Sequence, residues 1–312
     1  MIEALSSSLS PLCELRDIHK EYVLRRSLLD RFTRAERRVA AVDGVSLAIS
    51  HGRILGLVGE SGSGKSTLGQ ILVRLIEPTS GQVLYRGADV ADFAAAERRR
   101  FRHRVQMVFQ DTNSSLNPRK RIRRVLSEAV RARAVNHREE AASIRDESGQ
   151  LMNQVGLDAA LLGRFPHELS GGQRQRIGIA RALAMKPELL VADEPVSSLD
   201  VSMQGQIINL LRDLNEQLGL TIVLISHDLA IVARICAEIA VMKDGKIVEA
   251  GPARQVLAFP THPYTRTLLA SIPRGLQGRS RPCAVTDTAH GAAAACDRSS
   301  REVLETELKA GE

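Results

Sequence analysis

The chain has 312 residues, of which 44% are hydrophobic but only 3% aromatic, with no Trp, so aliphatic side chains must form its core. This length allows one large domain or two smaller ones, and no apolar run approaches the ~20 residues that a membrane-spanning helix requires. The formal net charge of +7 excludes a chain that is acidic overall and favours an anionic partner: a nucleotide, a nucleic acid or an anionic membrane surface.

The N-terminal segment carries Glu3 and several serines, where a secretory signal peptide has a basic stretch followed by an apolar core. The four cysteines are far apart and lack the paired spacing of a metal site, as is usual in a reducing compartment. We therefore expect a cytoplasmic protein. Alternating apolar and polar residues predict half-exposed strands at about Leu12 to Tyr22 and at Val45 to Ile49.

A basic stretch, 25–38, separates these two predicted strands and carries three large apolar side chains on one side. It is either a short amphipathic helix that touches a membrane or partner, or an exposed loop; we favour the loop. Shorter arginine runs, such as 98–100 and 119–121, are interpreted as solvated surface.

A glycine-rich loop joins the predicted buried strand Ile54–Val58 to a helix that begins near Leu68. Strand, glycine-rich loop, Lys-Ser and helix together are typical of a phosphate-binding site, whereas a plain turn with a solvated lysine is the weaker alternative. The glycines let successive N–H groups point at one anion, Lys65 reaches the terminal phosphates, and the Ser66 hydroxyl is placed to hold Mg²⁺. We therefore predict that a nucleoside triphosphate binds to this phosphate-binding loop, whose residues are Gly59, Glu60, Ser61, Gly62, Ser63, Gly64, Lys65, Ser66 and Thr67.

Further strands are predicted at Gly81–Tyr85 and at Val105–Phe109, the second of which ends at Gln110. From Asp111 to about Phe165 the pattern changes to charged helical segments, at about 125–135 and 144–155, with no strand signal. This stretch is predicted to be a helical insertion into an α/β domain.

The segment Leu169–Gln173 reads Leu-Ser-Gly-Gly-Gln, and Ser170 is a good N-cap for a helix that continues until Lys186-Pro187. Two glycines in the first turn, Gly171 and Gly172, leave the backbone bare for close approach to an anion. One nucleotide held by the phosphate-binding loop does not need a second such helix start. The segment is therefore either an ordinary cap or a site for a nucleotide held by another chain.

Apolar strands return at 188–192 and 220–225, and each is preceded by a helix, which indicates a parallel sheet covered on both faces. Asp193 and Glu194 follow the first of these strands, at the edge where open α/β sheets bind ligands. We expect Asp193 to hold Mg²⁺, directly or through water, and Glu194 to polarise the attacking water. The alternative is that Glu194-Pro195 only caps the next helix. His227 ends the second strand, and in the company of these acids we expect it to contact the γ-phosphate.

The pattern ends in a hairpin whose turn, 243–246, contains Asp-Gly between two apolar runs. Beyond Pro273 the composition predicts a loosely ordered tail, in which 302–309 would be a final helix.

In combination, these motifs resemble those of ATP-binding-cassette (ABC) ATPases, in the family's order and approximate spacing over roughly residues 12 to 250. The resemblance implies an α/β P-loop NTPase fold: a RecA-like parallel sheet core, an N-terminal antiparallel β subdomain and a helical subdomain inserted at about 111–165. It also implies a head-to-tail pair of cassettes, in which Ser170, Gly171, Gly172 and Gln173 of one chain close on the ATP of the other. The motifs that carry the resemblance are Gly59–Thr67, Gln110, Leu169–Gln173, Asp193-Glu194, Ser197–Asp200 and His227.

The family further implies three roles that the residues alone do not. Tyr22 would stack on adenine, Gln110 would contact Mg²⁺ and water and sense the transporter, and Asp200 would connect the two cassettes. The expected cofactors are ATP and Mg²⁺. The expected catalytic residues are Glu194, His227, Lys65 and Gln110, and the expected Mg²⁺ ligands are Ser66, Gln110 and Asp193.

A finer resemblance is carried by Asp111 with Ser115–Arg119, by Phe165–Glu168 and above all by Thr261-His262-Pro263-Tyr264-Thr265. These are similar to the ATP-binding subunits of bacterial oligopeptide, dipeptide and nickel importers, particularly the second of their paired ATPases. The chain departs from the pattern at Thr112, where proline is usual. It also has only Cys283 and Cys296 in the tail, short of the four cysteines of an iron–sulfur cluster, so none is predicted.

This resemblance implies an ATPase domain at 12–275 followed by a tail at 276–312. The expected partners are a second ATPase, either a paralogue or another copy, and two permeases, with a periplasmic or extracellular binding protein indirectly. The expected location is peripheral, at the cytoplasmic face of the inner membrane. A soluble cassette acting on nucleic acid is the first alternative, but one cassette with a short insertion argues against it, so no nucleic acid is expected. An exporter ATPase is the second alternative, and His262–Thr265 argues against it. The transported substrate is not encoded in this chain.

Overall fold

The computed structural model describes residues 10–23, 38–110, 115–133 and 141–270, without the side chains of 141–143. These residues belong to one compact unit that ends at Leu276. The predictions for the basic stretch before Arg38, for Asp111 and Thr112, and for the tail with Cys283, Cys296 and a helix at 302–309 lie outside the described residues. The domain boundary at 275 therefore stays a prediction.

The N-terminal half of the unit contains an antiparallel sheet with the strand order β2-β1-β4-β5. Its strands are β1 (Cys13–Val23), β2 (Arg38–Ile49), β4 (Ser80–Tyr85) and β5 (Ala88–Asp89). In β1, Cys13, Leu15 and Ile18 are buried whereas Glu21 and Tyr22 are exposed, which is the alternation expected of a sheet with one solvated face. The predicted antiparallel β subdomain is confirmed.

The central sheet has the strand order β10-β9-β3-β8-β7-β6. Strands β9, β3, β8, β7 and β6 are parallel, and β10 pairs antiparallel with β9 as the predicted hairpin. Every residue of β3, β7 and β8 is buried, as expected when helices cover both faces. The bounds are β3 (Ile54–Val58), β6 (Val105–Val108), β7 (Leu189–Asp193), β8 (Thr221–Ser226), β9 (Glu238–Lys243) and β10 (Lys246–Pro252).

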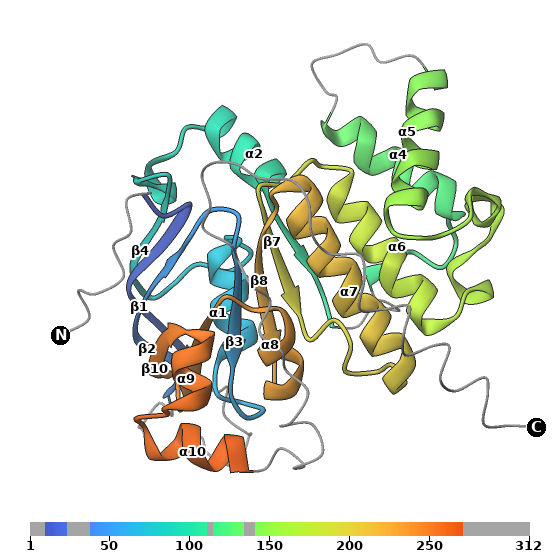
Figure 1. Cartoon of the computed structure of the whole chain (residues 1–312). Coiled ribbons are helices and arrows are strands. Elements are labelled where there is room, and N and C mark those ends of the chain that lie inside the picture. The colour runs from blue at the N-terminus through green and yellow to red at the C-terminus, as the bar shows by residue number, and fades with distance from the viewer. Residues whose placement is uncertain (1–9, 24–37, 111–114, 134–140, 271–312) are drawn as a thin grey trace, which may run out of the picture. The chain divides into compact units, whose positions relative to one another are not determined.

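The two faces of this sheet belong to two separate hydrophobic clusters. Leu55, Leu57 and Val191 pack with the antiparallel sheet and with α1 (Lys65–Leu72), which Figure 1 shows beside β3. Ile54 and Leu190 point to the other face, where they pack with three helices. These helices are α6 (Gly171–Leu183), α7 (Val201–Leu218) and α8 (Leu229–Ile235). The period-2 alternation of side chains along each strand thus divides one apolar run between two cores.

Between β6 and α6 the described residues form helices and turns but no strand, as predicted for the insertion. These are α4 (Ile122–Arg133), α5 (Ala141–Gln154) and two short 3₁₀ helices, η3 (Ala159–Gly163) and η4 (Pro166–Glu168). Arg133 at the end of α4 forms two hydrogen bonds to the Glu147 carboxylate of α5, at 2.7 and 2.8 Å, and a third to the Ala184 carbonyl at the end of α6, at 2.7 Å. The insertion is therefore tied to the helix that follows it.

Helix α2 (Ala95–Arg104) was not predicted. Phe101 is its only buried residue and most of the others are charged, so the sequence shows no helical repeat of apolar residues. Arg98, Arg99 and Arg100 are exposed, as interpreted from the sequence. The elements η2 (Val90–Asp92), α9 (Ala253–Ala258) and α10 (Pro263–Ala270) complete the described chain (Figure 1). In the part of the chain that the structure describes, no helix is long and apolar enough to cross a membrane.

Candidate nucleotide site

The phosphate-binding loop begins where β3 ends, and α1 begins at Lys65 with Gly64 as its N-cap. Gly64 has φ 102°, and a Cβ at this position would lie 2.2 Å from the Ala41 carbonyl oxygen. Only glycine fits here, for two reasons. Residues with a side chain disfavour this backbone conformation, and their Cβ would clash with a backbone oxygen that cannot move aside. The loop is thus wrapped closely enough for its N–H groups and the start of α1 to face one anion.

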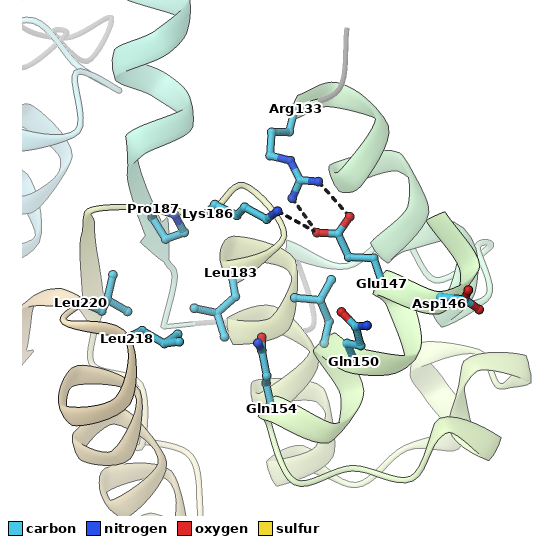
Figure 2. Close-up of a pocket in the computed structure, with 11 residues that line it drawn as sticks. Arg133, Asp146, Glu147, Gln150, Gln154, Leu183, Lys186, Pro187, Leu218 and Leu220 are labelled. Atoms are coloured by element: carbon cyan, nitrogen blue, oxygen red, sulfur yellow. Dashed lines mark hydrogen bonds and ion pairs between the residues drawn. The ribbon is translucent and has the colours of Figure 1, made fainter. Parts of the chain in front are cut away.

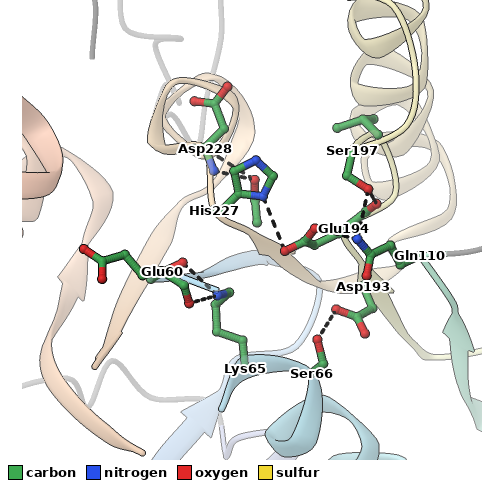
Figure 3. Close-up of polar contacts among 12 residues, drawn as sticks. Glu60, Lys65, Ser66, Gln110, Asp193, Glu194, Ser197, His227 and Asp228 are labelled. Atoms are coloured by element: carbon green, nitrogen blue, oxygen red, sulfur yellow. Dashed lines mark hydrogen bonds and ion pairs between the residues drawn. The ribbon is translucent and has the colours of Figure 1, made fainter. Parts of the chain in front are cut away.

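Lys65 is only 4% exposed, and its ammonium lies over the loop. Its Nζ donates to the carbonyl oxygens of Gly59 and Glu60, each at 2.7 Å, and to the Ser63 hydroxyl at 3.3 Å (Figure 3). Burial lowers the pKa of Lys65, whereas the nearby carboxylates of Glu194, Asp193 and Glu60 oppose that shift. These carbonyl contacts hold the positive charge of Lys65 beside the loop, where it could interact with a bound phosphate.

Ser66 and Asp193 meet at the ends of α1 and β7, where the Ser66 hydroxyl donates to Asp193 Oδ1 at 2.9 Å (Figure 3). Asp193 is only 5% exposed, and burial raises the pKa of its carboxyl, although the bond from Ser66 opposes the shift. A buried carboxylate beside a hydroxyl is an all-oxygen donor set. This set fits Mg²⁺, which binds through one or two carboxylates and completes its shell with water and phosphate oxygens.

Glu194 lies between two polar partners that come from other strands of the same sheet edge. Its Oε2 accepts from Gln110 Nε2 at 2.9 Å, and its Oε1 lies 3.3 Å from His227 Nδ1 (Figure 3). Glu194 has φ 42°, in the left-handed region that few residues other than glycine adopt. The carboxylate thus lies at the ends of β6 and β8, where Gln110 and His227 contact its two oxygens.

Two other predicted residues, Tyr22 and Asp200, form no contact with this cluster that the structure shows. Tyr22 is 41% exposed near the end of β1, with Lys20 Nζ 5.3 Å from its ring centre. Asp200 caps α7 by accepting from Met203 N at 2.9 Å. The Ser202 hydroxyl also donates to Asp200 Oδ1, at 2.7 Å, and the bonds from Met203 N and Ser202 lower the pKa of the Asp200 carboxyl.

The Leu169–Gln173 segment forms a capping box at the start of α6, as its sequence predicted. Ser170 N donates to Gln173 Oε1 at 2.9 Å, and Gln173 N donates to the Ser170 hydroxyl at 3.3 Å. Among the described residues, no hydrogen bond or ion pair joins these two to Lys65, Asp193, Glu194 or His227. The second of the two alternatives, a nucleotide held by another chain, is compatible with this separation.

Sequence reasoning missed two supports of the site. Ser197 accepts from Gln110 Nε2 at 3.3 Å and donates to the Glu194 carbonyl at 3.2 Å, so it closes a ring of contacts around Glu194. The hydroxyl of Tyr264 accepts from the backbone N–H of Glu60 at 3.0 Å. Ser197 is only three residues from Glu194, so its contact follows from the local turn. The contact between Tyr264 and Glu60 could not be predicted from any local sequence pattern.

A cavity of about 830 Å³ lies apart from this cluster, between α5 and the C-terminal ends of α6 and α7. Figure 2 shows the Arg133–Glu147 pair at its rim, with Lys186 Nζ 3.8 Å from the same carboxylate. Its other lining residues are Asp146, Gln150, Leu151, Gln154, Leu183, Pro187, Leu218 and Leu220. It contains none of the predicted nucleotide-site residues.

The parallel sheet, the glycine-rich loop at the end of β3 and the carboxylates at the end of β7 together define a P-loop nucleoside triphosphatase. The family profile described as "ABC transporter" matches residues 42–197, and the profile described as "Oligopeptide/dipeptide transporter, C-terminal region" matches residues 248–294. The chain belongs to the ABC transporter ATPase family.

Three related proteins place the chain more closely. It is 47% identical over 264 residues to a putative peptide import ATP-binding protein of Brucella ovis, covering 85% of this chain and 79% of that protein. It is 46% identical over 263 residues to the oligopeptide transport ATP-binding protein AppF of Bacillus subtilis, covering 84% and 78%. The solved structure of the ATP-binding cassette MJ0796, a dimer in a post-hydrolysis state bound to ADP and Pi, superposes with a TM-score of 0.65 at 29% identity, covering 78% and 99%. The predicted fold and family are thereby confirmed.

Proposed function

We propose that this chain is the ATP-hydrolysing subunit of a bacterial importer of di- or oligopeptides, or of nickel. The observation that carries the proposal is the convergence of Lys65, the Ser66–Asp193 pair and the Gln110–Glu194–His227 chain at one edge of the central sheet. The names of the two relatives, a peptide import and an oligopeptide transport ATP-binding protein, support a peptide cargo. Nickel rests only on the finer sequence resemblance, which the Thr261–Thr265 segment carries most strongly.

In the proposed site, the loop amides and Lys65 bind the phosphates, and Ser66 and Asp193 hold Mg²⁺, with Gln110 as a further ligand. Mg²⁺ would neutralise charge on the transferring phosphoryl group. Glu194 accepts the proton of the attacking water or orients that water, because its carboxylate is held from both sides by Gln110 and His227. His227 and Lys65 supply donors to the charge that develops on the γ-phosphate oxygens. Tyr22 would stack on the adenine.

The ATPase is proposed to work as a head-to-tail pair with a second copy or a paralogue. The capping box uses the N–H groups of Ser170 and Gln173. The N–H groups of Gly171 and Gly172, at the same helix start, would then be available to bind a phosphate. A second chain that presents its nucleotide would supply that anion, and Asp200 would lie at the same interface. The dimeric structure of MJ0796 supports this arrangement.

Two permeases are the proposed membrane partners, with this chain peripheral on their cytoplasmic face and a binding protein acting indirectly. The helical insertion is the proposed permease contact. Gln110 lies two residues beyond the end of β6, just before the insertion, and donates to Glu194, so a movement of the insertion would reach the hydrolytic carboxylate directly. Transport follows only if ATP favours the closed pair over the open one, since a ligand of equal affinity shifts nothing.

The variant Glu194→Gln tests the proposed mechanism. Glutamine keeps the size of the side chain and an oxygen that accepts from Gln110, but it cannot take a proton. We expect Mg-ATP binding to be retained and turnover to fall by about 10²- to 10⁴-fold, the usual contribution of a general base. The matched control is Glu216→Gln, whose side chain is 62% exposed on α7. Near-normal turnover in Glu194→Gln would remove Glu194 from its role.

A further inference from the structure

A helix far along the chain reaches the phosphate-binding loop. Tyr264, in the first turn of α10, is only 7% exposed, and its hydroxyl accepts the backbone N–H of Glu60 at 3.0 Å. The two residues are 204 positions apart. Glu60 is the second residue of the loop, so the contact fixes the point at which the chain leaves β3 and begins to wrap around the phosphate position.

The Tyr264 ring is itself held in place by its own segment. Glu249 accepts from Thr261 N at 2.8 Å and from His262 N at 3.1 Å, which pins the start of the Thr261–Thr265 segment to β10. His262 Nδ1 accepts from Tyr264 N at 3.2 Å, and Lys243 Nζ lies 5.0 Å from the Tyr264 ring centre. The hydroxyl is therefore presented by an ordered segment and not by a swinging side chain.

A second contact from the same end of the chain holds the middle of the loop. The N–H of Gly245, in the β9–β10 turn, donates to the Ser63 carbonyl at 3.1 Å, and the Gly245 carbonyl accepts from Asp43 N at 2.9 Å. The loop is thus held at Glu60 and at Ser63 by residues that follow β9. In a loop with several glycines at positive φ, such external contacts replace the conformational restriction that side chains would otherwise give.

From these contacts we infer that Tyr264 is a positioning residue for nucleotide binding. Its hydroxyl keeps the loop in the phosphate-binding conformation before ATP arrives, and this inference rests on the nucleotide site proposed above. A binding-competent conformation that is only partly populated weakens the apparent affinity by that fraction. The Thr261–Thr265 segment thus acts on ATP affinity through the backbone of Glu60, without touching the nucleotide itself.

The test is Tyr264→Phe in the full chain, which removes the hydroxyl and keeps the ring. We expect the dissociation constant of Mg-ATP to rise by about 2- to 10-fold, the change expected for the loss of one neutral hydrogen bond. Because the hydroxyl changes only the fraction of loops that are ready to bind, it affects ground state and transition state equally, so KM should rise while kcat stays within about twofold. Hydrogen exchange of the peptide that contains Glu60 should also become faster in the nucleotide-free variant.

The matched control is Tyr85→Phe, which removes the hydroxyl of a tyrosine that is equally buried but bonds to Glu188 instead. This variant should lower thermal stability without changing the Mg-ATP dissociation constant or the exchange at Glu60. An unchanged dissociation constant in Tyr264→Phe, or unchanged exchange at Glu60, overturns the inference. A parent chain that does not bind Mg-ATP would instead overturn the proposed function, so the two failures are distinguishable.

Discussion

A substitution at Gly56, in the middle of β3, tests whether the packing of α8 against this strand positions the nucleotide site. A Cβ at this position would lie 2.2 Å from Val232 Cγ1 and 3.0 Å from Cys236 Sγ, both on the α8 side of the sheet. Two carbon atoms in contact normally lie about 3.5–4.0 Å apart. The variant Gly56→Ala therefore forces α8 away from β3 by roughly 1 Å, or forces Val232 out of its rotamer.

The expected cost is about 1–3 kcal/mol, the range for overpacking a well-filled core. For a domain of this size, this corresponds to a fall in Tm of about 2–4 °C per kcal/mol. The same shift should lower ATPase activity, because β3 leads into the phosphate-binding loop and α8 follows His227 directly. Stability and activity are therefore expected to fall together.

A double-mutant cycle with Val232→Ala separates this clash from other effects. Val232 is fully buried, so Val232→Ala alone should cost about 1–3 kcal/mol for the lost methyl groups. In the double variant the new Cβ fills part of the space, so the summed single costs should exceed the measured cost by about 1–3 kcal/mol. Urea unfolding of the four proteins measures this coupling. Additive costs would refute the packing argument.

Two further perturbations concern the insertion and the α6 helix start. Hydrogen bonds from Arg133 lower the pKa of the Glu147 carboxyl, although burial opposes this shift. The ion pair therefore stabilises the fold fully at pH values above the unfolded pKa of about 4.3. This stabilisation is lost as the pH falls through the lower pKa of the folded state. Glu147→Gln should thus cost about 1–3 kcal/mol at pH 7 by urea unfolding, and the cost should become smaller as the pH falls below about 4. Asp146→Asn, at an exposed position, is the control, and a cost at pH 3 equal to that at pH 7 would contradict this. Ser170→Ala removes a side-chain cap and should cost about 1 kcal/mol at pH 7, measured in the same way, and an unchanged unfolding free energy would show that the cap contributes nothing.

The parts of the site that the sequence predicts are those whose chemistry is local. The phosphate-binding loop needs only a buried strand, glycines and Lys65 in consecutive order, and the Ser170 cap needs only its own helix start. Asp193, Glu194 and His227 are brought together because the strands before them are parallel neighbours, so their ends share one edge. A correct prediction of strand type and direction was therefore enough to predict this cluster.

The parts that the sequence does not predict depend on contacts between distant segments. Tyr264 belongs to a motif that the sequence marks, but its hydrogen bond to Glu60 depends on how α10 packs. The left-handed backbone conformation of Glu194 could not be predicted either, because Asp-Glu-Pro contains no glycine, the residue that usually marks this conformation. Helix α2 escaped prediction for the opposite reason, since a helix that buries one residue has no apolar period to detect.

Gly172 shows how a residue with a predicted role can have a second, structural one. Its absent side chain was interpreted as room for an anion, yet a Cβ there would lie 2.0 Å from Met203 Cε of α7. Met203 is also the residue whose N–H is capped by Asp200. The start of α6 therefore packs against the start of α7, and the two elements proposed to meet a second chain are in contact within this one. A partner that moved Gly172 would therefore also move the end of the Met203 side chain, which belongs to the helix start that Asp200 caps.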